Sequence, residues 1–292
     1  MSKWRRSISV AAAIIVLLIS NTPPVAATNN QTQGILITPA RQYITAAAGA
    51  SQTYQLSVAN ITNKPVDISF SVKQFRVADY TYDYTFLPVK ENWITFSTPQ
   101  IHLASGDSKT ISYVVGVPPG AVPGGHYFTL FASASLYSGA VPIDVQVTSV
   151  MYVTVSGSLI KTSSIKHSSI PTISFGGDIP FSIDVHNTGN THFFVYASGK
   201  LSGWTAKPTI DQGAHIILPG TTRTVNGVIA APLLPGIYTA KYGYKVDDGR
   251  QVNTSQTIVY LPPWAIIIPI AIIWITWTII VRIKRRVIRF SR

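Results

Sequence analysis

Cysteine is absent from this chain of 292 residues. The protein therefore has no disulfide bond, and both a thiol nucleophile and a cysteine-based metal site are excluded. An exported protein without disulfides is typical of a bacterial surface behind a single membrane, where export does not pass an oxidising folding machinery.

Acidic residues are few, with 11 Asp and Glu against 23 Lys and Arg, which gives a formal net charge of +12. The positive excess lies at the chain ends, because three basic residues precede the first apolar run and six follow the last one. The stretch between them carries fourteen basic residues and eleven acids, without a basic stripe that alternates with aromatic residues. The charge therefore indicates membrane topology, and we expect no nucleic-acid partner.

The N-terminus has the three parts of a secretory signal. A basic segment, MSKWRR, precedes an apolar run over residues 10–19, and small residues follow at Val25 and Ala27. This pattern predicts a signal peptide over residues 1–27 that is cleaved after Ala27. The alternative is an uncleaved N-terminal anchor, for which the run is short, since a span needs ~20 residues.

The other long apolar run lies near the C-terminus, where residues 264–281 read WAIIIPIAIIWITWTIIV without a charge. A helix of this length covers roughly 27 Å, enough to cross a bilayer core, and Trp264 suits the headgroup region. The predicted anchor also includes the basic residues that follow, Arg282, Lys284, Arg285 and Arg286. Because positive flanks stay inside, we expect a single-pass protein of the cell membrane with a cytoplasmic tail, residues 282–292, and the bulk of the chain extracellular.

Residues 28–262 show strand patterns and no helical period. Apolar and polar residues alternate in TYQLSVAN and VDISFSVKQF, and Gly or Pro interrupts the chain roughly every ten residues, as in all-β sandwiches.

Three signals then occur twice in the same order. They are a strand that ends in an Asn turn at Asn60 and Asn187, a Leu–small–Gly signal at Leu103 and Leu218, and a Pro–Gly corner before Tyr127 and Tyr238. The repeat predicts two tandem immunoglobulin-like β-sandwiches, a distal one over residues 30–157 and a membrane-proximal one over residues 158–262. In such folds a corner Tyr binds the upstream backbone, and we expect this structural role for both rather than ligand stacking.

The first copy contains an insertion, ADYTYDYTFLPVKENW, that the second lacks. Tyr80, Tyr82, Tyr84 and Phe86 alternate there, so a strand would present them on one aromatic face. Together with Trp93 they form the candidate binding surface, because Tyr supplies contact area at low entropic cost. The alternative is an extra edge hairpin whose aromatic residues pack on the sandwich.

The chain resembles the WxL-interacting cell-surface proteins of Gram-positive bacteria. The resemblance lies in ITPARQYITAAAGASQTYQLSVANITNKPVDI, in LASGDSKTISYVVGVPPGAVPGGHYFTLFA, and in the anchor from Trp264. It covers nearly the whole chain in order, through loose motifs. The resemblance implies peptidoglycan binding by the distal domain and binding of partner or host proteins by the second, without assigning site residues.

The sequence lacks the usual signatures of an enzyme. No nucleophile elbow, phosphate loop, calcium loop or pair of carboxylates stands out. His186 and His192 flank one turn, and without a carboxylate partner they are expected to be turn residues rather than metal ligands. We therefore expect no catalytic residue, no cofactor and no metal.

These observations favour a non-enzymatic, membrane-anchored surface protein that binds cell-wall polymer, other exported proteins, or both. One alternative is a chaperone-like assembly factor that recognises surface subunits by β-strand addition, which requires an exposed, alternating edge strand and a basic anchor such as Lys73 or Arg76. Another is a carbohydrate-binding accessory module, for which the tyrosines of the insertion would be the aromatic platform.

Overall fold

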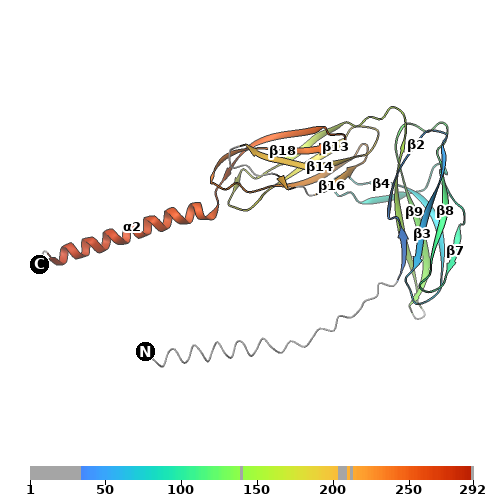
Figure 1. Cartoon of the computed structure of the whole chain (residues 1–292), viewed down its shortest axis with the longest axis horizontal. Helices are drawn as coiled ribbons and strands as arrows, with labels where there is room; N and C mark the ends of the chain where they lie inside the picture. Colours follow the sequence, from blue (N-terminus) through green and yellow to red (C-terminus); the bar gives the residue numbers. More distant parts are fainter. Residues whose placement is uncertain (1–33, 139–140, 203–208, 211–212, 291–292) are drawn as a thin grey trace, which may run out of the picture. The chain divides into compact units, whose positions relative to one another are not determined.

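The computed structural model describes residues 34–138, 141–202, 209–210 and 213–290 (Figure 1). The predicted signal peptide, residues 1–27, lies outside the described residues. The described part consists of nineteen strands and one long helix, α2.

Strands β1 to β10 form the first sandwich from two sheets. One sheet has the order β1-β3-β8-β6 and the other the order β2-β10-β9-β4-β5, with β7 also paired to β4. The bounds are β1 Ile35–Thr38, β2 Arg41–Ala46, β3 Ser51–Asn60, β4 Val66–Val77, β5 Tyr84–Leu87, β6 Ile94–Phe96, β7 Gln100–Leu103, β8 Ser108–Gly116, β9 Gly124–Ser138 and β10 Val141–Val155.

Strands β11 to β19 form the second sandwich in the same way. Its sheets have the orders β11-β13-β17-β15 and β12-β19-β18-β14-β16. The bounds are β11 Ser163–Ser169, β12 Ile173–Ser174, β13 Ile179–Asn187, β14 Phe193–Ser202, β15 Thr209–Ile210, β16 Ala214–Ile217, β17 Thr222–Ile229, β18 Gly236–Val246 and β19 Gln251–Tyr260.

The two sandwiches repeat one strand order. The sheet β1-β3-β8-β6 corresponds to β11-β13-β17-β15, and the path β2-β10-β9-β4-β7 corresponds to β12-β19-β18-β14-β16. In each sandwich one short strand, β2 or β12, runs parallel to the last strand, whereas the other pairs are antiparallel. This topology confirms the predicted all-β class with two tandem immunoglobulin-like sandwiches. Of the described strands, only β5 has no counterpart in the other copy.

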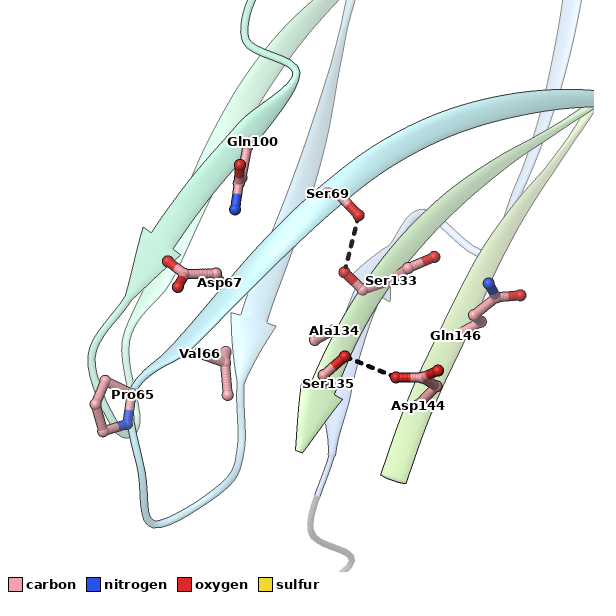
Figure 2. Close-up of a pocket in the computed structure, with 10 residues that line it drawn as sticks. All are labelled: Pro65, Val66, Asp67, Ser69, Gln100, Ser133, Ala134, Ser135, Asp144 and Gln146. Atoms are coloured by element: carbon pink, nitrogen blue, oxygen red, sulfur yellow. Dashed lines mark hydrogen bonds between the residues drawn. The ribbon is translucent and has the colours of Figure 1, made fainter. Parts of the chain in front are cut away.

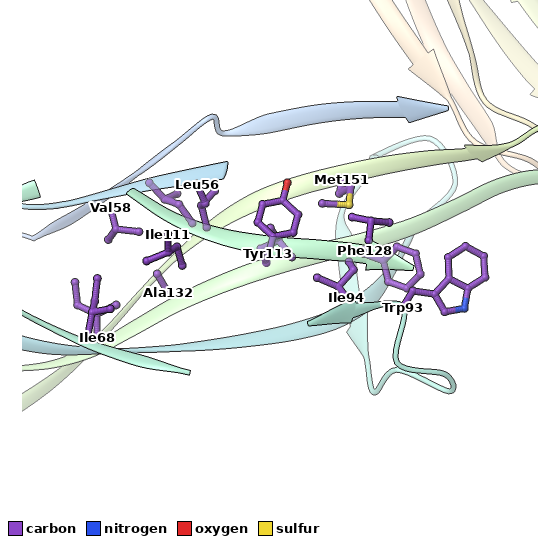
Figure 3. Packing of buried hydrophobic residues seen from close by; sticks show 14 of the residues in the cluster. Leu56, Val58, Ile68, Trp93, Ile94, Ile111, Tyr113, Phe128, Ala132 and Met151 are labelled. Carbon is purple, nitrogen blue, oxygen red and sulfur yellow. The ribbon is translucent and has the colours of Figure 1, made fainter. Parts of the chain in front are cut away.

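Alternating apolar side chains fill the core of the first sandwich (Figure 3). Leu56 of β3, Ile68 of β4 and Phe128 of β9 are at most 1% exposed, while their sequence neighbours lie on the other face of the sheet because side chains alternate along a strand. The second sandwich has its own core, which includes Phe181, Val185, Val225, Tyr242 and Tyr244.

Two buried asparagines close equivalent turns in the two sandwiches. Asn60 and Asn187 are both 0% exposed. The side-chain amide nitrogen of Asn60 donates to the carbonyls of Lys64 at 2.8 Å, Ala104 at 2.9 Å and Leu103 at 3.3 Å, and that of Asn187 to the carbonyls of Thr191 at 2.9 Å and Ile217 at 3.0 Å. The Asn turn is thereby tied to the start of the Leu signal in the first sandwich and to the residue directly before it in the second, which explains why these two signals recur together.

Helix α2, Pro263–Phe290, follows the second sandwich almost directly (Figure 1). Only Leu261 and Pro262 separate it from β19. Its segment Pro263–Ile283 has a mean hydropathy of 2.4 and none of that window is buried, so the helix is long and apolar enough to cross a membrane. Trp264 at its start is 46% exposed, whereas the side chains of Lys284, Arg285 and Arg286 lie outside those the structure describes.

Candidate functional site

The Tyr-rich insertion forms a turn and a short strand rather than one continuous strand. Only Tyr84 to Leu87 are extended, as β5, which pairs antiparallel with β4. Tyr80 and Tyr82 both have φ of 64°, a left-handed conformation that breaks the alternation. The expectation of one aromatic strand face through all four side chains is therefore wrong.

The turn of the insertion contacts the second sandwich. The Asp79 carboxylate accepts the N–H of Thr222 at 2.7 Å, and the N–H of Tyr80 donates to the Thr222 carbonyl at 2.7 Å. The Arg223 guanidinium lies 4.1 Å from the centre of the Tyr82 ring. These contacts join the insertion to the start of β17, so the Tyr82 ring already has a partner, Arg223, within the chain.

The remaining residues of the predicted surface are divided between packing and solvent. The Tyr84 hydroxyl lies 3.3 Å from the Tyr152 hydroxyl, and Phe86 is 39% exposed beside Phe131. Trp93 is only 6% exposed and belongs to the core of the first sandwich, so the sequence interpretation of Trp93 as a surface residue is wrong. Its ring packs against His126 and Phe128 of β9, at 4.5 and 5.4 Å between ring centres.

An aromatic cluster holds the two sandwiches together. Tyr127 and Tyr152 of the first sandwich lie 5.7 and 5.3 Å from His192 of the second, between ring centres. Burial raises the pKa values of Tyr127 and Tyr152, so both stay neutral. Burial, together with the charge of Lys161, lowers the pKa of His192 to about 4, so the imidazole is neutral at pH 7.

Close backbone packing reinforces this junction. The Gly125 N–H donates to the Asn190 carbonyl at 2.8 Å. A Cβ on Gly124, whose φ is +139°, would lie 2.5 Å from that same carbonyl oxygen, so only glycine permits the approach. The Pro–Gly corner of the first sandwich therefore serves the junction as well as the turn.

The predicted corner tyrosines have different positions. The Tyr238 hydroxyl donates to the Leu234 carbonyl at 2.9 Å, four residues upstream. In the first sandwich, His126 Nε2 makes the matching contact with the Val122 carbonyl at 2.9 Å. Tyr127 points to the other face of β9, towards His192. The expectation that the Tyr127 hydroxyl ties the corner is therefore wrong. His126, one residue earlier, makes this contact, because neighbouring residues of a strand place their side chains on opposite faces.

The strongest candidate binding site is a free strand edge on β10. β10 pairs with β9 along its whole length, but β2 covers its other side only from Val150 to Val155. Among the described residues, no strand pairs with the rest of that side. We call residues 143–149 of this side the free β10 edge. Such an edge is a template for pairing with another chain.

The free β10 edge combines backbone groups that have no strand partner among the described residues with an alternating side-chain pattern. Since the N–H of Val150 donates to the Ala40 carbonyl in this direction, the backbone groups of Asp144, Gln146 and Thr148 point the same way. The intervening side chains are apolar, namely Ile143, which is 49% exposed, and the half-buried Val145 and Val147. Lys73 and Arg76, the expected basic anchor, lie on β4 and are separated from β10 by β9.

A polar groove lies on the outer face of the same sheet (Figure 2). It forms where β4 separates from β9 beyond Ser69, and its volume is about 520 Å³. Its polar lining residues are Asp67, Ser69, Gln100, Ser133, Ser135, Asp144 and Gln146. It contains no aromatic side chain, so it offers hydrogen bonds but no stacking platform.

The structure brings together no metal-binding cluster among the residues it describes. His186 Nδ1 lies 3.1 Å from the Thr222 hydroxyl, while His192 belongs to the aromatic junction. The two histidines therefore have separate structural partners.

Comparisons with known proteins give structural similarity only. No family model and no curated protein matches the sequence. Solved structures that match include a chaperone–tip adhesin complex of CFA/I fimbriae, at 12% identity over 78% of this chain and 99% of that chain with a TM-score of 0.41. The class 5 fimbriae chaperone CfaA matches at 10% identity over 78% and 100%, with a TM-score of 0.40. A CsuC–CsuE chaperone–tip adhesion subunit complex from Acinetobacter baumannii matches at 12% identity over 78% and 99%, with a TM-score of 0.39. Similarity at this level assigns no activity to the chain.

Proposed function

We propose that this chain is a non-enzymatic, membrane-anchored surface protein that binds extended segments of exported polypeptides at the free β10 edge. The bound segment adds a strand to the sheet, and the protein thereby acts as a scaffold or assembly factor for surface subunits. The observation that carries the proposal is that, within the described part of the chain, backbone groups without a strand partner coincide with alternating apolar side chains from Ile143 to Val147.

Strand addition fits the chemistry of this edge. The bound segment satisfies the outward N–H and C=O groups of Asp144, Gln146 and Thr148, which supply affinity for any extended backbone. Ile143, Val145 and Val147 then favour a segment with apolar residues at alternate positions, because side chains of neighbouring strands pair on one face. The partner is therefore an extended, alternating apolar segment.

The anchor supports a partner at the cell surface. Helix α2 supplies the membrane span, and we place the sandwiches outside because the basic residues follow the helix. We therefore expect the partner to bind the exterior part.

The test uses the full chain in lipid nanodiscs and a fluorescent ten-residue peptide of alternating Val and Thr. Gln146→Pro removes an N–H of the free edge without removing a bond to β9, and we expect about tenfold weaker binding, the effect of one lost hydrogen bond. Gln146→Ala keeps the N–H and should bind like the parent.

A matched control lies in the second sandwich. The Val259 N–H donates to the Thr172 carbonyl, so the N–H of Ser255, four residues earlier, points to the same side of β19, where that side is open. Ser255→Pro therefore removes an edge N–H from the second sandwich, as Gln146→Pro does from the first. Binding should survive it, and hydrogen exchange should slow at residues 143–149 when the peptide binds. Equal losses in both proline variants, or no slowing at this edge, contradict the proposal.

The polar groove of Figure 2 favours cell-wall polymer as a second candidate ligand. Its amide, carboxylate and hydroxyl groups match the donors and acceptors of a glycan. Co-sedimentation of the nanodisc-bound chain with purified sacculi should be lost in the double variant Gln100→Ala, Asp144→Ala. Binding that is unchanged in this variant excludes the groove as the site.

A further inference from the structure

Five large apolar side chains are exposed at the end of the second sandwich from which α2 emerges. They are Ile173 at 49%, Phe175 at 62%, Leu233 at 64%, Leu234 at 42% and Ile237 at 76% exposure. We call these five residues the apolar rim. Contiguous exposed apolar groups of this kind mark an interaction surface.

Strand pairing and a backbone hydrogen bond place the apolar rim beside the start of the helix. β12, which contains Ile173, pairs with Val259 and Tyr260, and Ile237 also pairs with Val259. The N–H of Leu261 donates to the Ser174 carbonyl at 2.8 Å. The rim therefore surrounds the last residues of β19, two positions before α2 begins.

The turn after Phe175 reaches the helix itself. A Cβ on Gly176 would lie 3.0 Å from Cδ of Pro263, the first residue of α2. On the other side, the bond from the Tyr238 hydroxyl to the Leu234 carbonyl holds the Leu233–Leu234 turn in place. Both parts of the rim are thus fixed on the sandwich near the helix start.

The two ends of the second sandwich differ in charge. The three segments that carry or adjoin the rim, residues 171–179, 230–240 and 258–264, contain a single charged residue, Asp178, whose carboxylate accepts the Ala231 N–H at 2.9 Å. The opposite end carries two ion pairs, Lys161 with Asp247 and Arg250 with Asp248. Among the described segments of the second sandwich, those at the helix end are the ones suited to an apolar environment.

We propose that the apolar rim penetrates the interface of the same bilayer that α2 spans, so that the second sandwich stands on the membrane surface. The inference rests on the membrane anchoring proposed above. A lipid bilayer is the occupant that the structure favours, because the rim is continuous with the spanning helix and Trp264 lies at the junction.

The absence of cysteine allows a clean test by site-specific labelling. Single variants Ile237→Cys, Asp248→Cys and Ile272→Cys are labelled with an environment-sensitive fluorophore, in the full chain reconstituted into phosphatidylcholine–phosphatidylglycerol vesicles. These positions report on the rim, on the charged end and on the helix centre. Lipids that carry a quencher at a shallow or a deep position then give the depth of each label.

At Ile237→Cys we expect a blue shift and quenching by the shallow quencher, whereas Asp248→Cys should show neither. If the deep quencher quenches the label at Ile272→Cys while the label at Ile237→Cys is in water, the rim proposal is overturned and the membrane anchor is retained. If both labels are in water, the membrane anchoring itself is overturned. A shielded Ile237→Cys label that lipid quenchers do not reach shows that protein covers the rim, and also overturns the proposal.

Discussion

The two sandwiches have one strand order but different open edges. In the first, the uncovered side of β10 is flanked on its core face by Val145 and Val147. In the second, β12 covers even less of β19, yet the core-face side chains along its uncovered stretch are Val252, Thr254 and Gln256, of which only Val252 is apolar. An open edge is thus common to both copies, whereas an apolar alternating edge occurs only in the first.

This difference indicates how two copies of one fold can have different roles. The first sandwich has an apolar edge, to which we propose an extended partner binds, and its extra strand β5 belongs to the insertion that joins it to the second. The second sandwich has a more polar edge, and exposed apolar groups lie at its helix end. On the functions proposed above, the same scaffold serves for binding in one copy and for mounting on the membrane in the other.

The largest expected effect concerns the feature that the copies share, the buried Asn. Asn60→Ala should destabilise the first sandwich by about 3 kcal/mol and Asn187→Ala the second by about 2 kcal/mol, because buried carbonyls lose their donors and Asn60 makes more hydrogen bonds. Hydrogen exchange of the full chain measures each sandwich separately. Equal losses in both sandwiches from either variant would show that they unfold as one unit.

Acid should weaken the junction between the copies. Burial lowers the pKa of His192 to about 4 from the ordinary 6.5, so between these pH values the unfolded chain binds more protons than the folded one. The stabilisation is full above pH 6.5 and falls as the pH drops towards 4, by up to about 3 kcal/mol. His192→Gln should flatten the dependence of the melting temperature on pH in this window, and an unchanged slope would contradict the assignment.

A smaller effect is expected at the insertion. Asp79→Ala removes the acceptor for the Thr222 N–H and should cost about 1.5 kcal/mol. Exchange at the Thr222 amide reports the loss, with the exposed Asp83→Ala in the same turn as its control. If exchange accelerates equally in both variants, the carboxylate of Asp79 does not carry the contact.

The smallest effects distinguish the two corners. Tyr238→Phe should cost about 1 kcal/mol by removing the bond to the Leu234 carbonyl, whereas Tyr127→Phe should stay within ~0.5 kcal/mol, since its hydroxyl lies 3.4 Å from His192. Thermal melting of both variants makes the comparison. A larger loss for Tyr127→Phe would reverse the assignment of the corner residue.

Local signals made the fold predictable from the sequence. The Asn turn, the Leu signal and the Pro–Gly corner each act over a few residues, and both copies contain all three, so the tandem sandwiches followed from their order. Aligning the two corners on their tyrosines places the corner residue of the first sandwich one position too late. Counting from the glycine instead aligns Gly124 with Gly236, and therefore His126 with Tyr238.

The candidate site was harder to predict because it depends on distant partners. Tyr82 contacts Arg223, far along the chain, and no local pattern shows that its ring is covered. The free β10 edge exists because β2 is short, which only strand pairing reveals. The alternation of Ile143, Val145 and Val147 was present in the sequence, but alternation alone does not distinguish an edge strand from a central one.

The short connection of Leu261 and Pro262 between β19 and α2 limits the reach of the protein. On the membrane anchoring proposed above, the sandwiches have no tether that reaches into the space above the cell, and their own dimensions set the distance over which they meet a partner. We therefore expect partners to come to them, as newly exported chains would when they emerge from the same membrane. On this proposal the protein receives its partner where the partner is delivered.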